Sequence, residues 1–273
     1  MKTSFRLMKR ASVLASIDTS ACFNGSMFAG NSLVSNILGR GDHGSVYSAC
    51  TPVTRVNGKV VCGDNTTLFA VKIVKQMSSH ERTALEICLE LVAKNVCPNF
   101  TILYGIVRCP QCPLPNIGSC SVFVTEYAHK GDLSHWVKMA RNTKYIDNVM
   151  FQICCAVYAL FKHGRRAHND LHLGNILVHP VDAGGSWMYV VDGVTYYCPN
   201  IGVLVTLADF DKCRPATATL DHVRVAKLIR LVCTKIPDTT KSLLKTIESQ
   251  TISQVFGLFG YTRKLPVIEQ YVI

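Results

Sequence analysis

The sequence predicts an α+β fold with a β-rich N-terminal part of five strands and one helix, followed by a compact, mainly helical part. Three observations predict it. The 273 residues are 48% hydrophobic, enough for one two-lobed domain with a sizeable core. Alternating and apolar runs separated by glycine-rich turns dominate before about residue 128. Helical spacing of apolar residues dominates after it.

The first segment, residues 1–32, is basic and rich in serine, and its first acidic residue is Asp18. Its apolar stretch is too broken for a secretory signal. We therefore expect a flexible basic N-terminal tail.

Residues 33–128 carry the pattern of the β-rich part. The stretch 35–50 predicts a strand, a glycine turn and a second strand, and Asn57-Gly58 marks the turn of a long hairpin connection. Three more strands are predicted over 68–75, 100–109 and 120–128, and a helix over 78–95.

Residues 129–273 turn helical. The clearest helix covers 146–164, with Asp147 as N-cap and Gly164 as stop. Two strands are predicted over 186–193 and 202–211, and two closing helices over 220–233 and 239–260.

The net charge of +11 favours polyanionic partners, although a basic surface also serves solubility alone. No dense run of Lys and Arg supports a nucleic-acid interface, so that partner is possible but unsupported. No apolar run reaches the roughly 18 residues of a membrane span.

The thirteen cysteines are odd in number and irregularly spaced, in a chain too long for a small disulfide scaffold. We therefore expect reduced thiols and a cytoplasmic or nuclear location. Cys109, Cys112 and Cys120 have some character of a zinc site, but a lone Cys-x-x-Cys is a weak signal.

Three polar features point to phosphate chemistry, and the first is "GRGDHG", which covers Gly39, Arg40, Gly41, Asp42, His43 and Gly44. It lies between two predicted strands, which argues against a dinucleotide-binding strand–helix turn. Such a hairpin can fold its amides over phosphates, because glycine permits close backbone approach. An ordinary glycine-rich hairpin is the alternative.

The second feature is Lys72, inside an otherwise apolar strand. A charge there is costly unless it is paired or bound. Glu86, on the helix that follows, is a natural partner, and the ammonium would then meet an anion. A lysine on an edge strand that reaches solvent is the alternative.

The third feature combines "HNDLHLGN" with "LADFD", and so Asp170, Asn175 and Asp209. Carboxylate and amide oxygens suit Mg²⁺, which takes few protein ligands together with phosphate oxygens. Asp170 would orient and deprotonate an attacking hydroxyl. Each residue taken alone is also a common turn former.

In this order the motifs resemble those of eukaryotic-type protein kinases, over roughly residues 36–233. "GRGDHGSV" is similar to the glycine-rich loop and "FAVK" to the phosphate-binding lysine motif. "HNDLHLGN" is similar to the catalytic loop and "DFD" to the magnesium-binding motif. The resemblance implies a bilobal kinase fold, with residues 33–128 and 129–273 as its lobes.

The resemblance also implies roles for individual residues. Asp170 would be the catalytic base, Asn175 and Asp209 would hold Mg²⁺, and Lys72, anchored by Glu86, would contact the ATP phosphates. Glu81 and Glu90 are rivals of Glu86. The remaining ATP-binding residues would be the glycine-rich loop 39–44 with Val46 and Ala70, Thr125 as gatekeeper, Glu126 and Ala128 through backbone groups to adenine, and Asp132 near the ribose.

Several departures place the chain within that family. Asn169 replaces the arginine that usually reads a phosphorylated activation loop, so switching of that kind is not expected. His172 stands where many kinases have a lysine near the γ-phosphate, so the resemblance implies a catalytic role for it. A neutral imidazole gives less charge stabilisation there, though it can donate a hydrogen bond. Asp211 ends the magnesium motif, and no Ala-Pro-Glu element follows.

A long insertion before Asp209 also distinguishes the chain. Together with His172 it resembles haspin-like kinases and kinases of large DNA viruses, which would work in the cytoplasm or nucleus of a host cell. Asp221 matches the aspartate that braces the catalytic loop in kinases.

The first functional hypothesis is a protein kinase that transfers phosphate from MgATP to Ser or Thr of protein substrates. A small-molecule phosphotransferase is the second, because "HNDLHLGNIL" is also close to the loop of aminoglycoside and choline kinases. The third is a pseudokinase scaffold, of which Asn169, His172 and Asp211 would be signs. A nucleic-acid-binding module ranks below all three, and the oligomeric state is open.

Overall fold

A computed structural model describes residues 2–18, 21–24, 26–30, 32–41, 44–112, 118–233 and 235–273. The chain divides into two compact units. The sheet unit comprises Ser4–Ser78 and Ile102–Tyr127, and the helical unit comprises Ser79–Thr101 and Ala128–Ile273 with the start of the chain. The sheet unit ends at Tyr127, whereas the sequence places the end of the β-rich part at residue 128. The helix predicted over 78–95 belongs to the helical unit rather than to the β-rich part.

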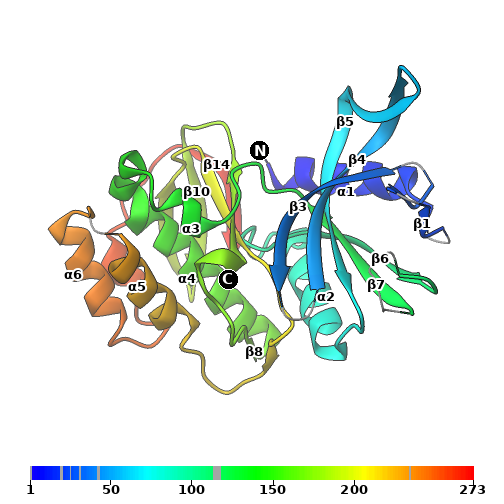
Figure 1. Cartoon of the computed structure of the whole chain (residues 1–273). Helices are drawn as coiled ribbons and strands as arrows, with labels where there is room; N and C mark the ends of the chain where they lie inside the picture. The colour runs from blue at the N-terminus through cyan, green and yellow to red at the C-terminus, as the bar shows by residue number, and fades with distance from the viewer. Residues whose placement is uncertain are drawn as a thin grey trace. The chain divides into compact units, whose positions relative to one another are not determined.

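The sheet unit is built on a seven-stranded sheet with the order β1-β2-β3-β4-β5-β7-β6. The sheet has seven strands where five were predicted, and Figure 1 shows the β4–β5 hairpin extending beyond the rest of the sheet. The bounds are β1 Phe23–Asn24, β2 Met27–Phe28, β3 Ser32–Gly41, β4 Gly44–Val56, β5 Lys59–Val74, β6 Leu103–Cys109 and β7 Cys120–Glu126. The two extra strands, β1 and β2, come from the segment expected to be a tail.

That segment is not a flexible tail. Helix α1 (Thr3–Ser16) buries Val13 completely and donates a hydrogen bond from Arg10 Nε to the Leu103 carbonyl oxygen at 2.9 Å. Arg6 is 1% exposed and forms an ion pair with Glu126 of β7. The basic composition that suggested a tail includes side chains that anchor the helix to β6 and β7.

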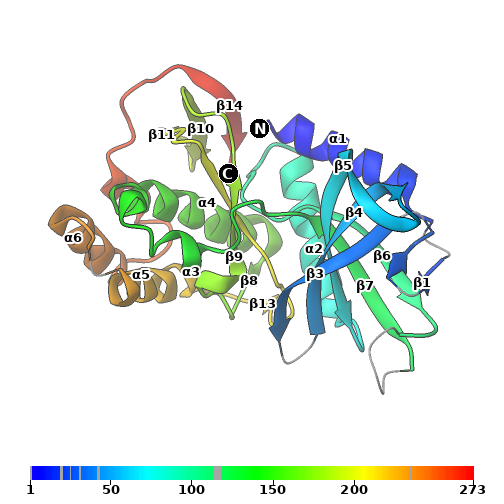
Figure 2. The same cartoon turned by 45° about the horizontal axis from the view of Figure 1, so that its top comes forward.

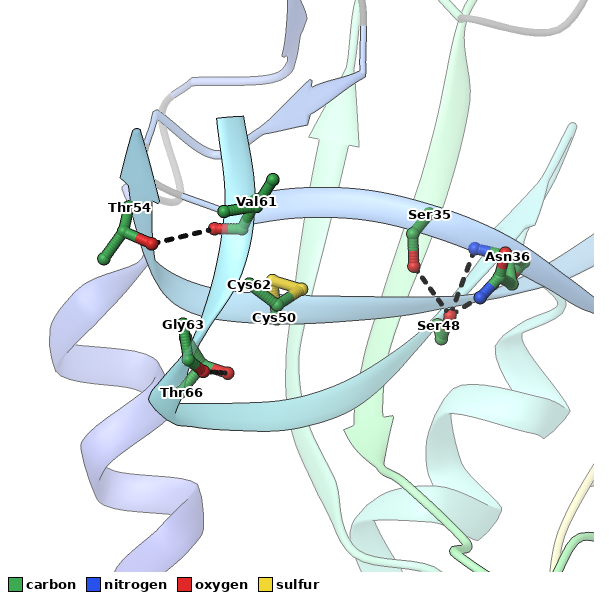
Figure 3. The surroundings of a disulfide bond; sticks show 9 residues. All are labelled: Ser35, Asn36, Ser48, Cys50, Thr54, Val61, Cys62, Gly63 and Thr66. Atoms are coloured by element: carbon green, nitrogen blue, oxygen red, sulfur yellow. Dashed lines mark hydrogen bonds between the residues drawn. A yellow bond between two sulfur atoms is a disulfide. The ribbon is translucent and has the colours of Figure 1, made fainter. Parts of the chain in front are cut away.

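The expectation of reduced thiols is wrong for four of the thirteen cysteines. Disulfides join Cys22 to Cys109 and Cys50 to Cys62. Figure 3 shows the second one linking β4 to β5, near the hydrogen bond between the Ser35 and Ser48 hydroxyls. The other nine cysteines are free, and all but Cys112 are buried.

A zinc site with Cys109 as ligand does not fit this arrangement, because the sulfur of Cys109 is bonded to Cys22. The described part of the chain contains no group of three or more His, Cys, Asp or Glu side chains able to hold a metal ion. Burial and a hydrogen bond with Cys112 raise the pKa of the Cys120 thiol to about 12.

The helical unit is organised around α4 (Ile146–Gly164), which has the predicted bounds. Fourteen of its 19 residues are buried, so its side chains are covered on nearly every side, as expected of a central helix. The Phe151 ring meets aromatic rings of the insertion and of the C-terminal region, at centroid distances of 5.6 Å to Tyr189 and 5.2 Å to Phe259. Tyr145, rather than Asp147, occupies the N-cap position.

The remaining elements surround α4. The helices are α2 Ser79–Ala93, α3 Leu133–Trp136, α5 Asp221–Val232 and α6 Asp238–Ile247, with short 3₁₀ helices η1 Ala140–Tyr145, η2 Leu173–Asn175 and η3 Phe256–Phe259. The strands are β8 Arg166–Ala167, β9 Ile176–Pro180, β10 Ser186–Val191, β11 Val194–Pro199, β12 Val203–Leu207, β13 Arg214–Pro215 and β14 Val267–Val272. None of the helices described is long and apolar enough to cross a bilayer.

The insertion before Asp209 forms a small sheet of its own. Strands β10 and β11 pair as an antiparallel hairpin, and β14 at the end of the chain pairs in parallel with β10 (Figure 2). The closing helix predicted over 239–260 is shorter than expected, because α6 ends at Ile247. The strand β14 was not predicted from the sequence.

Candidate active site

The predicted site residues fall into two groups, one in each unit. The sheet unit carries Gly39, Arg40, Gly41, Gly44, Val46, Ala70, Lys72, Thr125 and Glu126. The helical unit carries Glu86, Ala128, Asp132, Asp170, His172, Asn175 and Asp209. Asp42 and His43, which were also predicted to bind the cofactor, lie outside the described residues.

The glycine-rich segment is a hairpin, as its pattern predicts, with Gly41 opposite Gly44. Gly44 is required by packing, since a Cβ there would lie 2.2 Å from the Ile73 carbonyl oxygen. Beside Gly39 and Gly41 a Cβ would meet no atom within 4 Å. The space next to these two residues is therefore open, which suits the approach of a phosphate group to the backbone.

One face of the sheet unit gathers four predicted ATP-binding side chains. Val46 is opposite Lys72 in the strand register, and Ala70 is opposite Thr125. Directly opposite residues share a face, and so do residues two apart on one strand, so all four lie on the same face. The Lys72 ammonium lies 5.9 Å from the centre of the Phe123 ring, which is opposite Lys72 on the same face. Apolar side chains beside an ammonium fit a base and its phosphates.

Glu126 has a different place. It is 4% exposed, its Oε2 accepts a hydrogen bond from Arg6 Nε at 3.0 Å, and its Oε1 accepts one from the Ile102 N–H at 2.9 Å. Its own backbone N–H donates to the Ile102 carbonyl oxygen. This N–H is therefore bonded within the sheet unit, and the contact of a Glu126 backbone group with adenine stays a prediction.

Helix α2 carries three acidic candidates for the partner of Lys72. Glu86 is exposed and forms an ion pair with Arg82 at 2.9 Å, and Glu90 is exposed and pairs with Lys94. Glu81, in contrast, is 3% exposed. A buried carboxylate requires compensation, whereas an exposed one does not. The role given to Glu86 stays a prediction, and so does the rivalry of Glu81 and Glu90.

The segment after β7 bends sharply. The Gly131 N–H donates to the Ala128 carbonyl oxygen at 3.0 Å. Asp132 caps α3, because its carboxylate accepts hydrogen bonds from the Ser134 hydroxyl and from the His135 side chain and N–H. Partial burial raises the pKa of Asp132, but these hydrogen bonds outweigh it and the pKa is lowered. The ionised Asp132 would have one oxygen left for a ribose hydroxyl.

The loop that contains Asp170 is braced from α5. Asp221 accepts hydrogen bonds from the His168 N–H at 2.7 Å and the Asn169 N–H at 3.0 Å, and it also accepts one from the Thr219 hydroxyl. The bracing role expected of Asp221 is confirmed. His168 is buried and its Nε2 is 3.0 Å from the Ala208 carbonyl oxygen. Burial lowers the pKa of His168 against the nearby Asp221 charge, so the ring is a neutral part of this scaffold.

Asp170, Asn175 and Asp209 lie at one end of the β9–β12 pair. The Asn175 amide nitrogen donates to the Asp170 carbonyl oxygen at 3.1 Å. Ile176 is opposite Leu207 in the register, and the Ala208 N–H donates to the Asn175 carbonyl oxygen at 2.9 Å. Asp209 follows directly, exposed and with φ of 61°.

This donor set fits a hard divalent cation. It comprises two carboxylates and one amide, and the amide nitrogen of Asn175 donates a hydrogen bond within the loop. Phe210 next to Asp209 is fully buried and lies 5.0 Å from the His168 ring, which fixes the backbone that carries the aspartate.

Two cations beside Asp170 were missed by the sequence reading. Lys212 Nζ lies 3.0 Å from Asp170 Oδ2, and Arg224 Nη1 lies 3.9 Å from Asp170 Oδ1. A lysine three residues beyond Asp209 is the signal that was available in the sequence. His172, by contrast, folds back over its own turn, where its Nδ1 accepts a hydrogen bond from the Gly174 N–H at 3.1 Å.

The sequence was compared with known proteins. The profile of the family described as protein tyrosine and serine/threonine kinase matches residues 33–210. An uncharacterized protein, 011L, of Invertebrate iridescent virus 3 is 31% identical over 159 residues, which are 51% of this chain and 21% of that protein. The probable serine/threonine-protein kinase 380R of Invertebrate iridescent virus 6 is 25% identical over 197 residues, or 63% of this chain and 35% of that protein.

A cellular relative gives a similar match. The serine/threonine-protein kinase ppk16 of Schizosaccharomyces pombe is 29% identical over 147 residues, which are 53% of this chain and 18% of that protein. The chain thus spans between about a fifth and a third of the length of these relatives. The family match covers well over half of the chain and includes the glycine-rich hairpin, Lys72, the Asp170 loop and Asp209. The chain therefore belongs to the family of protein tyrosine and serine/threonine kinases, of the eukaryotic type and with viral relatives.

Proposed function

We propose that this chain transfers the γ-phosphate of MgATP to serine or threonine hydroxyls of protein substrates. The observation that carries the proposal is the convergence of Asp170, Asn175 and Asp209 at the end of the β9–β12 pair, on a loop held by Asp221. Family membership supports the same reaction. The bilobal kinase arrangement, with the sheet unit and the helical unit as its lobes, is part of the proposal.

In the sheet unit, the open backbone beside Gly39 and Gly41 would receive phosphate oxygens, and the Lys72 ammonium would neutralise part of their charge. The face formed by Val46, Ala70 and Thr125 would hold the base. These contacts fix the nucleotide and lower the entropic part of the barrier.

In the helical unit, Asn175 and Asp209 would hold Mg²⁺, which when bound neutralises charge on the phosphate oxygens. Asp170 orients the substrate hydroxyl and accepts its proton as the oxygen attacks phosphorus. The hydrogen bond from the Asn175 amide to the Asp170 carbonyl ties the two residues into one rigid loop. The Asp221 carboxylate holds that loop by accepting hydrogen bonds from the His168 and Asn169 N–H groups.

Protein rather than small-molecule substrates are favoured by two relatives, because both are named serine/threonine-protein kinases. Relatives from iridescent viruses support a kinase of viral type, at work in the cytoplasm or nucleus of a host cell. A small-molecule phosphotransferase would use the same loop and is the competing function.

The test is transfer of labelled γ-phosphate from ATP with Mg²⁺ to casein, histones and myelin basic protein. Wild type is compared with Asp209→Ala and, as a matched control, Asp182→Ala, which removes an exposed carboxylate elsewhere in the helical unit. We expect label with wild type and the control but not with Asp209→Ala. Label transferred to amines or sugars and to none of the proteins would favour the competing function. Absence of any thermal shift with MgATP would favour a scaffold.

A further inference from the structure

The side chain of His172 is bonded within its own turn. Its Nδ1 accepts a hydrogen bond from the Gly174 N–H at 3.1 Å. The ring is folded over the turn that it caps, since a Cβ on Gly174 would lie 3.1 Å from His172 Cε1. The cations that form ion pairs with Asp170 come from other residues, Lys212 and Arg224.

Lys212 provides such a charge. Its ammonium is 3.0 Å from Asp170 Oδ2, closer than the 3.9 Å between Arg224 and Asp170 Oδ1. The Lys212 side chain is 54% exposed, and the carboxylate is 25% exposed. An ion pair in contact with water is weakly held, so the ammonium can leave the carboxylate for another anion without a large cost.

The backbone of Lys212 is held firmly although its side chain is exposed. The Asn169 side chain donates to the Lys212 carbonyl oxygen at 3.3 Å, and the Cys213 N–H donates to the Phe210 carbonyl oxygen at 3.0 Å. Arg214 then pairs with Ala167 in the β8–β13 ladder. The ammonium is thus presented to Asp170 by a fixed segment, and one of the residues that fixes it, Asn169, belongs to the Asp170 loop itself.

We propose that Lys212 is the cation that contacts the phosphoryl group as it is transferred, and that Asn169 positions it. This inference rests on the proposed function. In the transfer, the bond from the β,γ-bridging oxygen to the γ-phosphorus breaks and a bond from the substrate hydroxyl oxygen forms. The hydroxyl proton goes to Asp170, and ADP leaves. Lys212 donates a hydrogen bond to a γ-phosphoryl oxygen and stabilises the charge there.

The geometry gives this role a specific signature. A cation beside the candidate base meets the γ-phosphoryl group but not the β-phosphate, so it distinguishes nucleotides with a γ-phosphate from ADP. A lysine that merely blocks Asp170 would give the opposite effect, because its removal would speed the reaction. A lysine that only supports the fold would affect both nucleotides alike.

The experiment measures affinity by calorimetry for the Mg²⁺ complexes of ADP and of the non-hydrolysable analogue AMP-PNP, together with kcat and KM for ATP. The variants are Lys212→Ala, Lys212→Met and Lys212→Arg, with Lys245→Ala on α6 as a control that removes an exposed charge elsewhere. Thermal melting of each variant reports its folding.

We expect Lys212→Ala and Lys212→Met to weaken AMP-PNP binding by about tenfold relative to ADP and to lower kcat by roughly a hundredfold, the loss typical of one transition-state donor. KM for ATP should change less than kcat does. Lys212→Arg should recover part of both losses, and Lys245→Ala should match wild type.

Unchanged kcat, faster turnover, or equal weakening of both nucleotides in the Lys212 variants would each overturn the assignment of Lys212 while leaving the proposed function intact. If wild type binds neither nucleotide and transfers no phosphate, the proposed function is overturned, and the assignment of Lys212 with it.

Discussion

Glu126 in the sheet unit and Asp170 in the helical unit are both carboxylates paired with cations, but their surroundings are opposite. Glu126 and its partner Arg6 are 4% and 1% exposed, and an additional backbone N–H satisfies the carboxylate. Asp170 is 25% exposed, and its partners Lys212 and Arg224 are more than half exposed. The buried pair fixes a strand to a helix. The exposed pairs leave a carboxylate whose partners can change, which a proton-accepting group requires.

The burial of a carboxylate, and not the unit to which it belongs, distinguishes the fixed carboxylates from Asp170. Asp221 lies in the helical unit with Asp170 but is 6% exposed, and it accepts hydrogen bonds from two backbone N–H groups and a hydroxyl. We therefore expect substitutions at Glu126, Arg6 and Asp221 to act on stability, and substitutions at Asp170 and Lys212 to act on turnover.

Breaking the buried pair should have the largest effect on stability. Arg6→Ala leaves the Glu126 charge buried without its cation, which costs about 3–5 kcal/mol of unfolding free energy. Denaturant unfolding measures it. Arg82→Ala, which breaks the exposed pair with Glu86, is the matched control and should cost less than about 1 kcal/mol. Equal losses in the two variants would refute the contrast between buried and exposed pairs.

Removal of the Cys50–Cys62 disulfide should come next. The two residues are 12 apart in sequence, so the cross-link removes about 3 kcal/mol of loop entropy from the unfolded chain. Cys50→Ser with Cys62→Ser should lower the melting temperature and leave kcat close to wild type, because the bond belongs to the scaffold. Wild type with a thiol reductant acts as the control, although Cys22–Cys109 is then reduced as well. A melting temperature unaffected by reductant would contradict this expectation.

Asp221→Asn tests a buried carboxylate that supports the site itself. It removes one charged acceptor from the Asp170 loop, for a loss of about 1.5–3 kcal/mol. Unlike Arg6→Ala, it should also lower kcat, because the loop that carries Asp170 loses its brace. Retention of full kcat, with a lowered melting temperature, would separate the brace from catalysis.

The smallest effect on stability is expected from a change of pH. His222 is buried, with Nε2 3.0 Å from the Gln250 carbonyl oxygen, and burial lowers its pKa against the raising effects of that carbonyl and of Asp221. The unfolded chain therefore binds a proton near pH 6.5 while the folded chain binds it at lower pH. Stability should be complete above about pH 6.5 and fall as the pH drops below that value.

His222→Gln removes this titration, so its unfolding free energy should change less between pH 7 and pH 5.5 than that of wild type. Melting curves at both pH values measure the difference. An identical pH dependence in the two proteins would show that His222 titrates equally in the folded and unfolded states.

Local patterns made much of this structure predictable. The helix over 146–164 has the predicted bounds because its apolar spacing is continuous, and the glycine hairpin and β5 follow from turn residues and alternation. Asp170 and Asn175 were found because they lie five residues apart in one polar stretch of the sequence. Asp209 was found because it directly follows an apolar strand. The bracing by Asp221 was found through the family resemblance and not through any local signal.

Pairings between distant segments were not predictable. Arg6 and Glu126 are 120 residues apart, and neither has a neighbour in sequence that marks it as buried. The pairing of β14 with β10 joins segments about 80 residues apart, and β14 has no distinctive pattern. Similarly, three acidic residues on α2 look alike in sequence, and only packing distinguishes the buried Glu81 from the exposed Glu86.

The most direct test of the account compares binding and transfer in one preparation of Asp170→Asn. MgATP binding is followed by thermal shift, and transfer of labelled phosphate to casein is followed under the same conditions. We expect the variant to bind MgATP as wild type does and to transfer phosphate about a thousandfold more slowly, because the proton acceptor is lost while the nucleotide contacts remain. Transfer at near wild-type rate would contradict the assignment of Asp170 and, with it, the proposed mechanism.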